Sequence, residues 1–207
     1  MSPYTEATLD WLRELELNND RDWFQANKKR YEKEVKKPHE QFVESLILAL
    51  SKVDPEIKVE PKDAIFRIYR DVRFSKDKSP YKTHVSAAIS AGGRRDHSRP
   101  GLYFQISGRT IGIASGMYAI EKDTILAVRR HIVANNDELE KLLADKKFKK
   151  MFGSVEGEKN KILPPEFKEA AKIQPLLFNK QFYYWVEYDA DEALRSDLLK
   201  FMVDHFK

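Results

Sequence analysis

Apolar residues in the first quarter of the chain recur every three or four positions, the spacing that places them on one face of an α-helix. Between two such stripes, Asn19 or Asp20 is suited to cap a new helix, because a short polar side chain accepts a backbone N–H there. Pro38 marks a kink or a new first turn. We therefore expect residues 1–54 to be helical, with stripes made of Leu9, Trp11, Leu12, Leu15, Phe42, Leu46 and Leu50.

The pattern then changes to an alternation with period two, which indicates β-strands over residues 62–118. "AIFRIYRDVRF" (64–74) predicts a strand in which Arg70 interrupts the alternation, and "HVSAAIS" (84–90) predicts a short one. "LYFQISGRTIGIA" (102–114) predicts a hairpin with Gly108 at the first position of a type II′ turn. In the first strand we expect Phe66, Ile68, Val72 and Phe74 to face the core, opposite Arg67, Tyr69, Asp71 and Arg73.

The second half of the chain returns to helical spacing, with one more strand. We expect helices over residues 121–153, a strand over 180–188 and a C-terminal helix over 190–206. This order predicts an α+β fold, with N-terminal helices, a central, mostly antiparallel sheet, and C-terminal helices packed around it. Because no linker separates the parts, residues 1–207 are interpreted as a single domain.

Charge is concentrated in one segment. The net charge is +4, but residues 67–99 hold nine Lys/Arg against three Asp/Glu, a net of +6. Such asymmetry indicates an anionic partner, or else a solvated basic face. The chain has no cysteine, no apolar run long enough for a membrane span and no secretory pattern at its N-terminus. These features predict a cytoplasmic protein.

The basic segment supplies candidate binding residues. Arginine forks suit bidentate contacts with phosphate, and tyrosine rings suit stacking on a base. The hypothesis is a cationic, aromatic cleft for a phosphate-containing ligand, a nucleotide or phospho-metabolite, as ligand or substrate. For Arg70, internal pairing is the favoured alternative, since Asp71 can bridge Arg70 or Arg73 and Asp77 can bridge Lys76, Lys78 or a distant Arg. The candidate ligand-binding residues are Arg67, Tyr69, Arg73, Ser75, Lys76, Lys78, Tyr81 and Lys82.

Whether the protein is an enzyme stays open at this point. His84 as acid or base, with Asp71 orienting it, is a weak catalytic pair, and the segment matches no catalytic motif. The cofactor is unknown, and the five scattered histidines (39, 84, 97, 131 and 205) form no metal motif. The alternative function is a non-enzymatic interaction module whose basic face docks nucleic acid or an acidic protein. The oligomeric state is left open.

Several stretches resemble an uncharacterised family, catalogued as domain of unknown function 2461. "RIYRDVRFSKDKSPYKTHVSAAIS" is similar to the signature stretch of that family, and "WLRELELNNDRDWFQANKKRYEKEV" to its N-terminal helical segment. "GLYFQIS", "GIASGMY" and "ILAVRRHI" resemble its central hairpin and the helix that follows. The resemblance is interrupted within residues 160–176. Members of the family often have a Pro-x-Gly-Phe/Tyr segment with a nearby His, whereas "LPPEFKEAAKIQP" has Glu166 in place of the glycine and lacks the His. The family label implies no activity.

Overall fold

The computed structural model describes residues 2–96 and 99–207 and confirms the α+β class. Four strands form an antiparallel sheet of order β1-β2-β3-β4, so each strand lies beside its neighbour in sequence. Val85 faces Ile106 across β1 and β2, and Ala87 faces Phe104. The strands are β1 (His84–Ile89), β2 (Gly101–Ser107), β3 (Thr110–Met117) and β4 (Phe182–Asp189).

By its contacts the chain divides into two compact units. The first comprises Met1–Arg95, Leu102–Ile113 and Glu187–Lys207, and the second Asp96–Gly101 and Ala114–Val186. The single domain expected from the sequence stays a prediction. None of the helices in residues 2–96 and 99–207 is long and apolar enough to span a bilayer.

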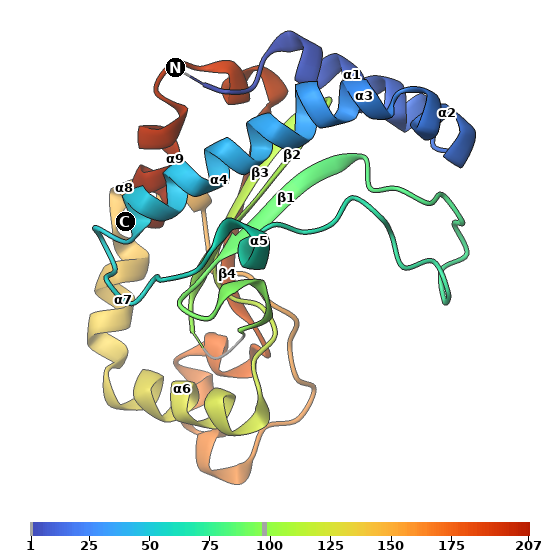
Figure 1. Ribbon diagram of the computed structural model, residues 1–207. Helices are drawn as coiled ribbons and strands as arrows, with labels where there is room; N and C mark the ends of the chain where they lie inside the picture. Colours follow the sequence, from blue (N-terminus) through green and yellow to red (C-terminus); the bar gives the residue numbers. More distant parts are fainter. Residues whose placement is uncertain (1, 97–98) are drawn as a thin grey trace. The chain divides into compact units, whose positions relative to one another are not determined.

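The helices of the first unit follow the predicted stripes. The residues of the first stripe, which lies on α1, are fully buried. The Asp20 carboxylate caps α2 by accepting from the Trp23 N–H at 2.9 Å, as predicted. In Figure 1, α4 lies across β1 and β2, and Phe42 meets Phe104 edge to face. The helices are α1 (Glu6–Leu17), α2 (Arg21–Ala26), α3 (Lys28–Arg30), a π-helical segment (Tyr31–Lys36), α4 (Lys37–Leu50), α5 (Pro61–Ala64) and α9 (Leu198–Phe206).

Pro38 gives the π-helical segment a physical cause. Proline has no N–H, so the carbonyl of Glu34, four residues earlier, loses its α-helical donor. The buried Thr8 hydroxyl of α1 donates to this carbonyl at 2.6 Å. The Thr8 oxygen also accepts from the Thr5 N–H at 3.2 Å. One side chain of α1 therefore supplies the hydrogen bond that proline removes from the neighbouring helix.

Three predictions about local structure were wrong. Residues 64–74 form no strand, because only Ile65 and Tyr69 make isolated bridges, and Phe74 is 96% exposed instead of facing the core. The β2–β3 hairpin is present, but Gly108 does not have the positive φ of a type II′ turn. The predicted C-terminal helix is divided into a 3-10 turn (Ala190–Leu194) and α9 by Arg195, whose backbone is extended.

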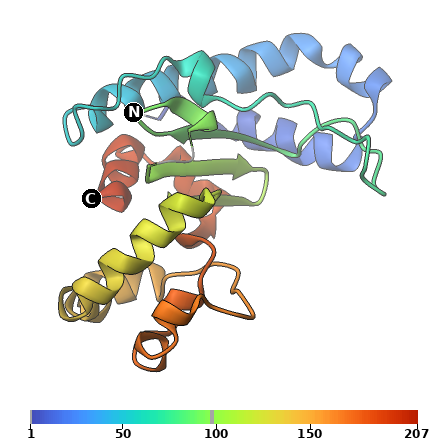
Figure 2. The ribbon, with the colours of Figure 1, turned by 90° about the horizontal axis from the view of Figure 1, so that it is seen from below.

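The second unit has a core of its own, and Figure 2 shows α6 beside the short turns that follow it in the chain. Buried Arg129 of α6 donates to the carbonyls of Leu177 and Asn179 at 2.8 and 3.1 Å. Glu166, in the segment where the family resemblance departs, pairs with Arg130 at 3.3 Å. The elements are α6 (Lys122–Ala134), α7 (Asn136–Ala144), α8 (Lys146–Phe152) and 3-10 turns at Pro165–Phe167, Ala170–Lys172 and Pro175–Phe178.

Candidate functional site

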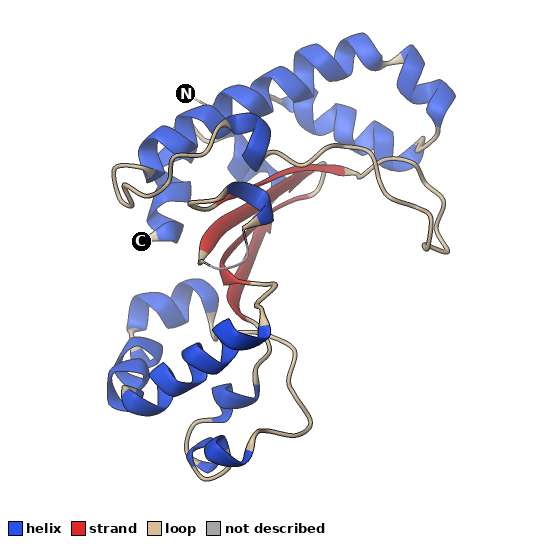
Figure 3. Cartoon of the chain, turned by 60° about the horizontal axis from the view of Figure 1, so that its bottom comes forward, coloured by secondary structure: helices blue, strands red, loops and turns tan. Residues whose placement is uncertain are grey.

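Residues 66–82, which hold most of the cations of the basic segment 67–99, form a long two-armed loop of the first unit, drawn without strand arrows in Figure 3. Its arms are antiparallel: the Phe66 N–H donates to the Ser86 carbonyl at 3.0 Å, and the Lys82 N–H to the Ile68 carbonyl at 2.8 Å. This pairing brings Arg67 on one arm close to Lys82 on the other. Two cations far apart in sequence thus share one end of the loop.

Tyr81 anchors the loop to the N-terminal helices. Its ring stacks on Phe24 with centroids 4.0 Å apart, and only 2% of the residue is exposed. Asn19 bonds both backbone groups of Tyr81, at 2.9 and 3.1 Å. Tyr69 packs against Phe24 and Tyr81 while remaining half exposed. Both tyrosines predicted to bind a ligand therefore belong to an aromatic cluster that fixes the loop.

Aspartates organise the tip of the loop. The Asp71 carboxylate accepts from Arg73 Nε and Nη2 at 3.0 and 2.7 Å, and this pairing lowers the pKa of Asp71 to about 2. Arg70 pairs internally, as favoured from the sequence, but with Asp77, whose carboxylate also accepts from the Ser79 N–H at 2.9 Å. These local bonds replace the strand ladder that the alternation had predicted.

Four of the predicted ligand-binding residues lie on this tip. Lys78 Nζ donates to the Val72 carbonyl at 2.9 Å, and Arg73 is engaged by its aspartate. The set consists of Arg73, Ser75, Lys76 and Lys78, and Phe74 is exposed among them.

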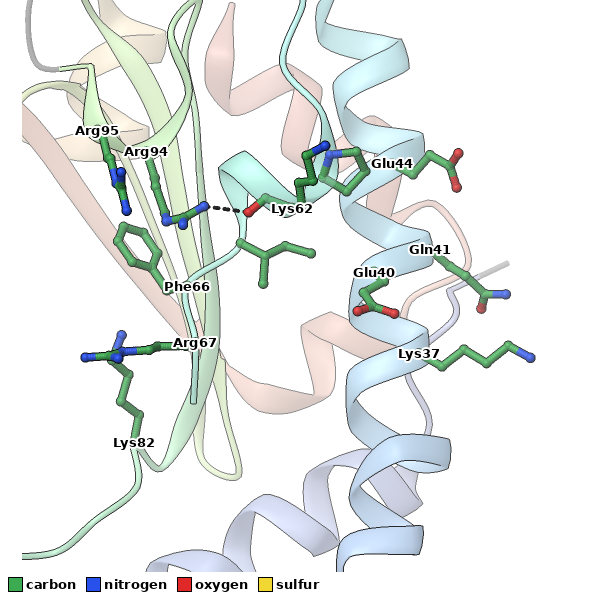
Figure 4. A pocket seen from close by; sticks show the side chains of 12 residues that line it. Lys37, Glu40, Gln41, Glu44, Lys62, Phe66, Arg67, Lys82, Arg94 and Arg95 are labelled. Atoms are coloured by element: carbon green, nitrogen blue, oxygen red, sulfur yellow. Dashed lines mark hydrogen bonds between the residues drawn. The ribbon is translucent and has the colours of Figure 1, made fainter. Parts of the chain in front are cut away.

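A groove of about 1060 Å³ opens on the first unit, between the base of the loop and α4. Of the predicted ligand-binding residues, it includes only Arg67 and Lys82. Figure 4 shows its two walls, with cations gathered around the Phe66 ring on one side and α4 on the other. It is lined by Lys37, Glu40, Gln41, Glu44, Pro61, Lys62, Ile65, Phe66, Arg67, Lys82, Arg94 and Arg95.

The cations of this wall are not engaged in ion pairs with the residues that the structure describes. Within the described residues, Arg67, Lys82 and Arg95 make no side-chain hydrogen bond or ion pair, and Lys82 Nζ lies 4.9 Å from the centre of the Phe66 ring. Burial, and then the neighbouring Arg67, lower the pKa of Lys82. Arg94 donates to the carbonyl of Lys62 at 2.6 Å. This wall thus concentrates positive charge that forms no ion pair within the described residues, although the charge of Arg67 helps to lower the pKa of Asp71.

Gly93 positions the two arginines that follow it. Its φ of +76° favours glycine, and a Cβ there would lie 3.0 Å from both the Asp63 carbonyl oxygen and Val59. The 3-10 turn Gly93–Arg95 can therefore approach α5 closely. This close approach places Arg94 on the carbonyl of Lys62.

The two predicted catalytic residues lie in different places. His84 begins β1, and burial lowers its pKa to about 4, with a further contribution from Lys82. Asp71 is on the exposed loop tip with Arg73. Neither lines the groove. At neutral pH His84 is therefore an uncharged imidazole, and the structure gives it no carboxylate partner among the described residues.

A family comparison agrees with the resemblance seen in the sequence. The model described as "Conserved hypothetical protein (DUF2461)" matches residues 7–207. The chain belongs to this family. No curated protein and no solved structure gives a significant match. Family membership thus accounts for the shared stretches, and the chemistry of the site rests on its own residues.

Sequence reasoning on this family member missed ten of the twelve lining residues, among them Arg94, Arg95 and Glu40. Arg94 and Arg95 lie within the basic segment 67–99, so charge counting included them without assigning them to a site. Glu40 gave no signal, because it is one of several carboxylates along a helix. Across residues 2–96 and 99–207, no group of three or more His, Asp and Glu side chains is placed to hold a metal ion. His97 lies outside the described residues.

Proposed function

We propose that the protein binds a phosphate-containing small molecule, a nucleotide or phospho-metabolite, in the groove beside α4. The observation that carries the proposal is the cluster of Arg67, Lys82 and Arg95, which have no carboxylate partner on the groove wall. Their charges repel one another in the empty groove, and a phosphate between them replaces repulsion with charge-assisted hydrogen bonds.

The chemistry of the three side chains suits phosphate. Each guanidinium presents parallel N–H donors that match two phosphate oxygens, and the ammonium adds a point charge. The lowered pKa of Lys82 supports the proposal, because it reflects burial beside another cation. A dianion bound there would raise the pKa of Lys82 towards its ordinary value.

The size of the groove supports an organic phosphate over a bare ion. The groove volume of about 1060 Å³ lies just above the usual range for small-molecule sites, about 300–1000 Å³. Inorganic phosphate would leave most of this volume to water. Phe66 and Ile65 add apolar surface beside the cations, which suits the carbon skeleton of an organic phosphate.

Titration calorimetry with nucleotides and sugar phosphates, chosen by a thermal-shift screen, tests the proposal. We expect Arg67→Ala to weaken binding about tenfold or more, because a hydrogen bond to a charged group contributes about 1.5–3 kcal/mol. Arg73→Ala is the matched control, since Arg73 is on the same loop but pairs with Asp71 outside the groove. If no phosphate compound binds, or if both variants bind like the wild type, the proposal is wrong.

A catalytic role for His84, with Asp71 as its orienting partner, stays a prediction. Because Asp71 already pairs with Arg73, the proposal assigns it no part in binding. The proposal is therefore one of binding, and it extends to catalysis only if a bound phosphate compound is converted. The cytoplasmic location expected from the sequence also stays a prediction.

The tip of the loop favours the alternative function, docking of nucleic acid. Phe74 is 96% exposed there, and Lys76 and Lys78 are exposed beside it, a combination suited to stacking on a base and contacting its phosphates. Binding at this tip would weaken steeply with salt and would be lost in a Lys76→Ala, Lys78→Ala double variant. The same variant should leave binding of small phosphates in the groove unchanged.

A further inference from the structure

Glu40 is a carboxylate that α4 presents to the groove without a partner. Glu40 lines the groove, and in Figure 4 its side chain stays over α4, whereas Lys37 and Glu44 extend away from the segment that carries Phe66 and Arg67. Glu40 makes no hydrogen bond or ion pair with any residue that the structure describes. The groove therefore has cations on one wall and, on the other, a carboxylate that is not engaged in an ion pair with the described residues.

The neighbours of Glu40 on its helix explain why it is unpaired. Residues three or four positions apart meet on a helix surface, so Lys36, Lys37 and Glu44 are the side chains within reach. Lys36 is already paired with Glu32, at 3.1 Å, and the charge of Glu40 acts on Lys36 without an ion pair, helping to raise its pKa. Lys37 extends away, and Glu44 has the same charge as Glu40. The nearby Lys62 of α5 is likewise paired, with Glu60 at 2.6 Å.

A carboxylate has a defined preference among ligand groups. When ionised it accepts hydrogen bonds and donates none, so it favours hydroxyl or amino groups and repels a second phosphate. The cations of the opposite wall have the reverse preference, since they only donate. A ligand with an anion at one end and donors at the other satisfies both walls, and a ligand with two anionic ends does not.

We propose that Glu40 selects the ligand of the groove, which is a phosphate monoester whose far end carries hydroxyl or amino donors, as in a phosphorylated sugar. This inference rests on the proposed binding of phosphate by Arg67, Lys82 and Arg95. The phosphate lies against these cations, the carbon skeleton lies along Ile65 and Phe66, and a donor group reaches the Glu40 carboxylate. A polymer of phosphate diesters differs from such a ligand because it carries an anion at every repeat.

Two probes of the same shape separate the two walls. Glucose 6-phosphate and cyclohexylmethyl phosphate have a six-membered ring and the same phosphate, but only the first has hydroxyl groups. Calorimetric titration of both probes into the wild type and Glu40→Ala gives a ratio of dissociation constants for each protein. We expect the preference for the sugar phosphate to fall about tenfold in Glu40→Ala, the effect of losing one hydrogen bond to a charged group.

Glu138→Ala is the matched control, because Glu138 is an exposed carboxylate on a helix, α7, and does not line the groove. It should keep the wild-type ratio, and Glu40→Ala should bind cyclohexylmethyl phosphate at least as well as the wild type. If both probes bind through Arg67 but Glu40→Ala keeps the wild-type ratio, the inference about Glu40 is wrong and the phosphate site stands. If neither probe nor any other phosphate compound binds the wild type, both proposals are wrong.

Discussion

Acidification from about pH 7 to about pH 4.5 should remove about 2 kcal/mol of folding stability through His39 alone. This histidine of α4 is only 2% exposed and lies among aromatic rings. Its Nδ1 is 2.8 Å from the hydroxyl of buried Tyr4. Burial lowers the pKa of His39 from 6.5 to about 4, although a contact with the backbone of Ser86 raises it in part.

The sign and size of the effect follow from proton linkage. At pH values between about 4 and 6.5, the unfolded chain binds a proton at this histidine and the folded protein does not. Stability is therefore fully present above the unfolded pKa and falls as pH decreases towards the folded pKa. A shift of one pKa unit corresponds to about 1.36 kcal/mol, so the full difference is about 3 kcal/mol, of which about 2 falls within the tested interval.

Urea unfolding of the wild type and His39→Gln over this pH interval measures the effect. The variant lowers stability at every pH, so the informative quantity is the difference between the two free energies of unfolding. That difference should decrease by about 2 kcal/mol on acidification, because glutamine does not titrate. NMR titration of His39 in the folded protein gives the pKa directly. Parallel pH profiles, or a measured pKa near 6.5, would refute the reasoning.

Two further predictions concern contacts of α1. Thr8→Val should destabilise the protein by about 1–3 kcal/mol, because it removes the hydroxyl that donates to the part-buried Glu34 carbonyl. The loss should shrink in a Pro38→Ala background that restores an N–H; a double-mutant cycle from urea unfolding measures this coupling, and additive losses would contradict it. Gly108→Ala should cost about 1–3 kcal/mol, because its Cβ would lie 2.5 Å from Cγ and 2.8 Å from N of Arg13. Gly153→Ala is the comparison: its Cβ would meet nothing within 4 Å, but the φ of +77° should cost about 1 kcal/mol. Thermal unfolding measures the stability of both variants, and a loss at Gly108 no larger than the loss at Gly153 would argue against the clash.

Local pattern was sufficient wherever an element is stabilised along its own length. The stripe of α1, the Asp20 cap and the β2–β3 hairpin are confirmed, because each depends on residues a few positions apart. The strand expected over 64–74 was wrong for a related reason. Alternation describes the faces of a strand but not its partner, and here Asp71 and Asp77 bond the backbone locally instead.

The hairpin turn shows the same difference between what a local pattern predicts and what a distant residue decides. Glycine at position 108 indicated a special conformation, yet its φ is not in the left-handed region. The space that a side chain at position 108 would need is instead occupied by Arg13, whose Nε donates to the Gly108 carbonyl at 2.7 Å. Position 108 therefore requires a glycine because of Arg13, 95 positions away, and not because of the turn conformation that local rules had predicted.

The sequence by itself determined the α+β class, the family and the concentration of cations between residues 67 and 99. Only the tertiary structure decided which of these charges stand together. It pairs Arg70 and Arg73 with aspartates, stacks Tyr81 on Phe24, and leaves Arg67 and Lys82 on the groove wall opposite Glu40. The amount of charge follows from composition, whereas its compensation depends on which charged side chains the fold brings within a few ångströms of one another.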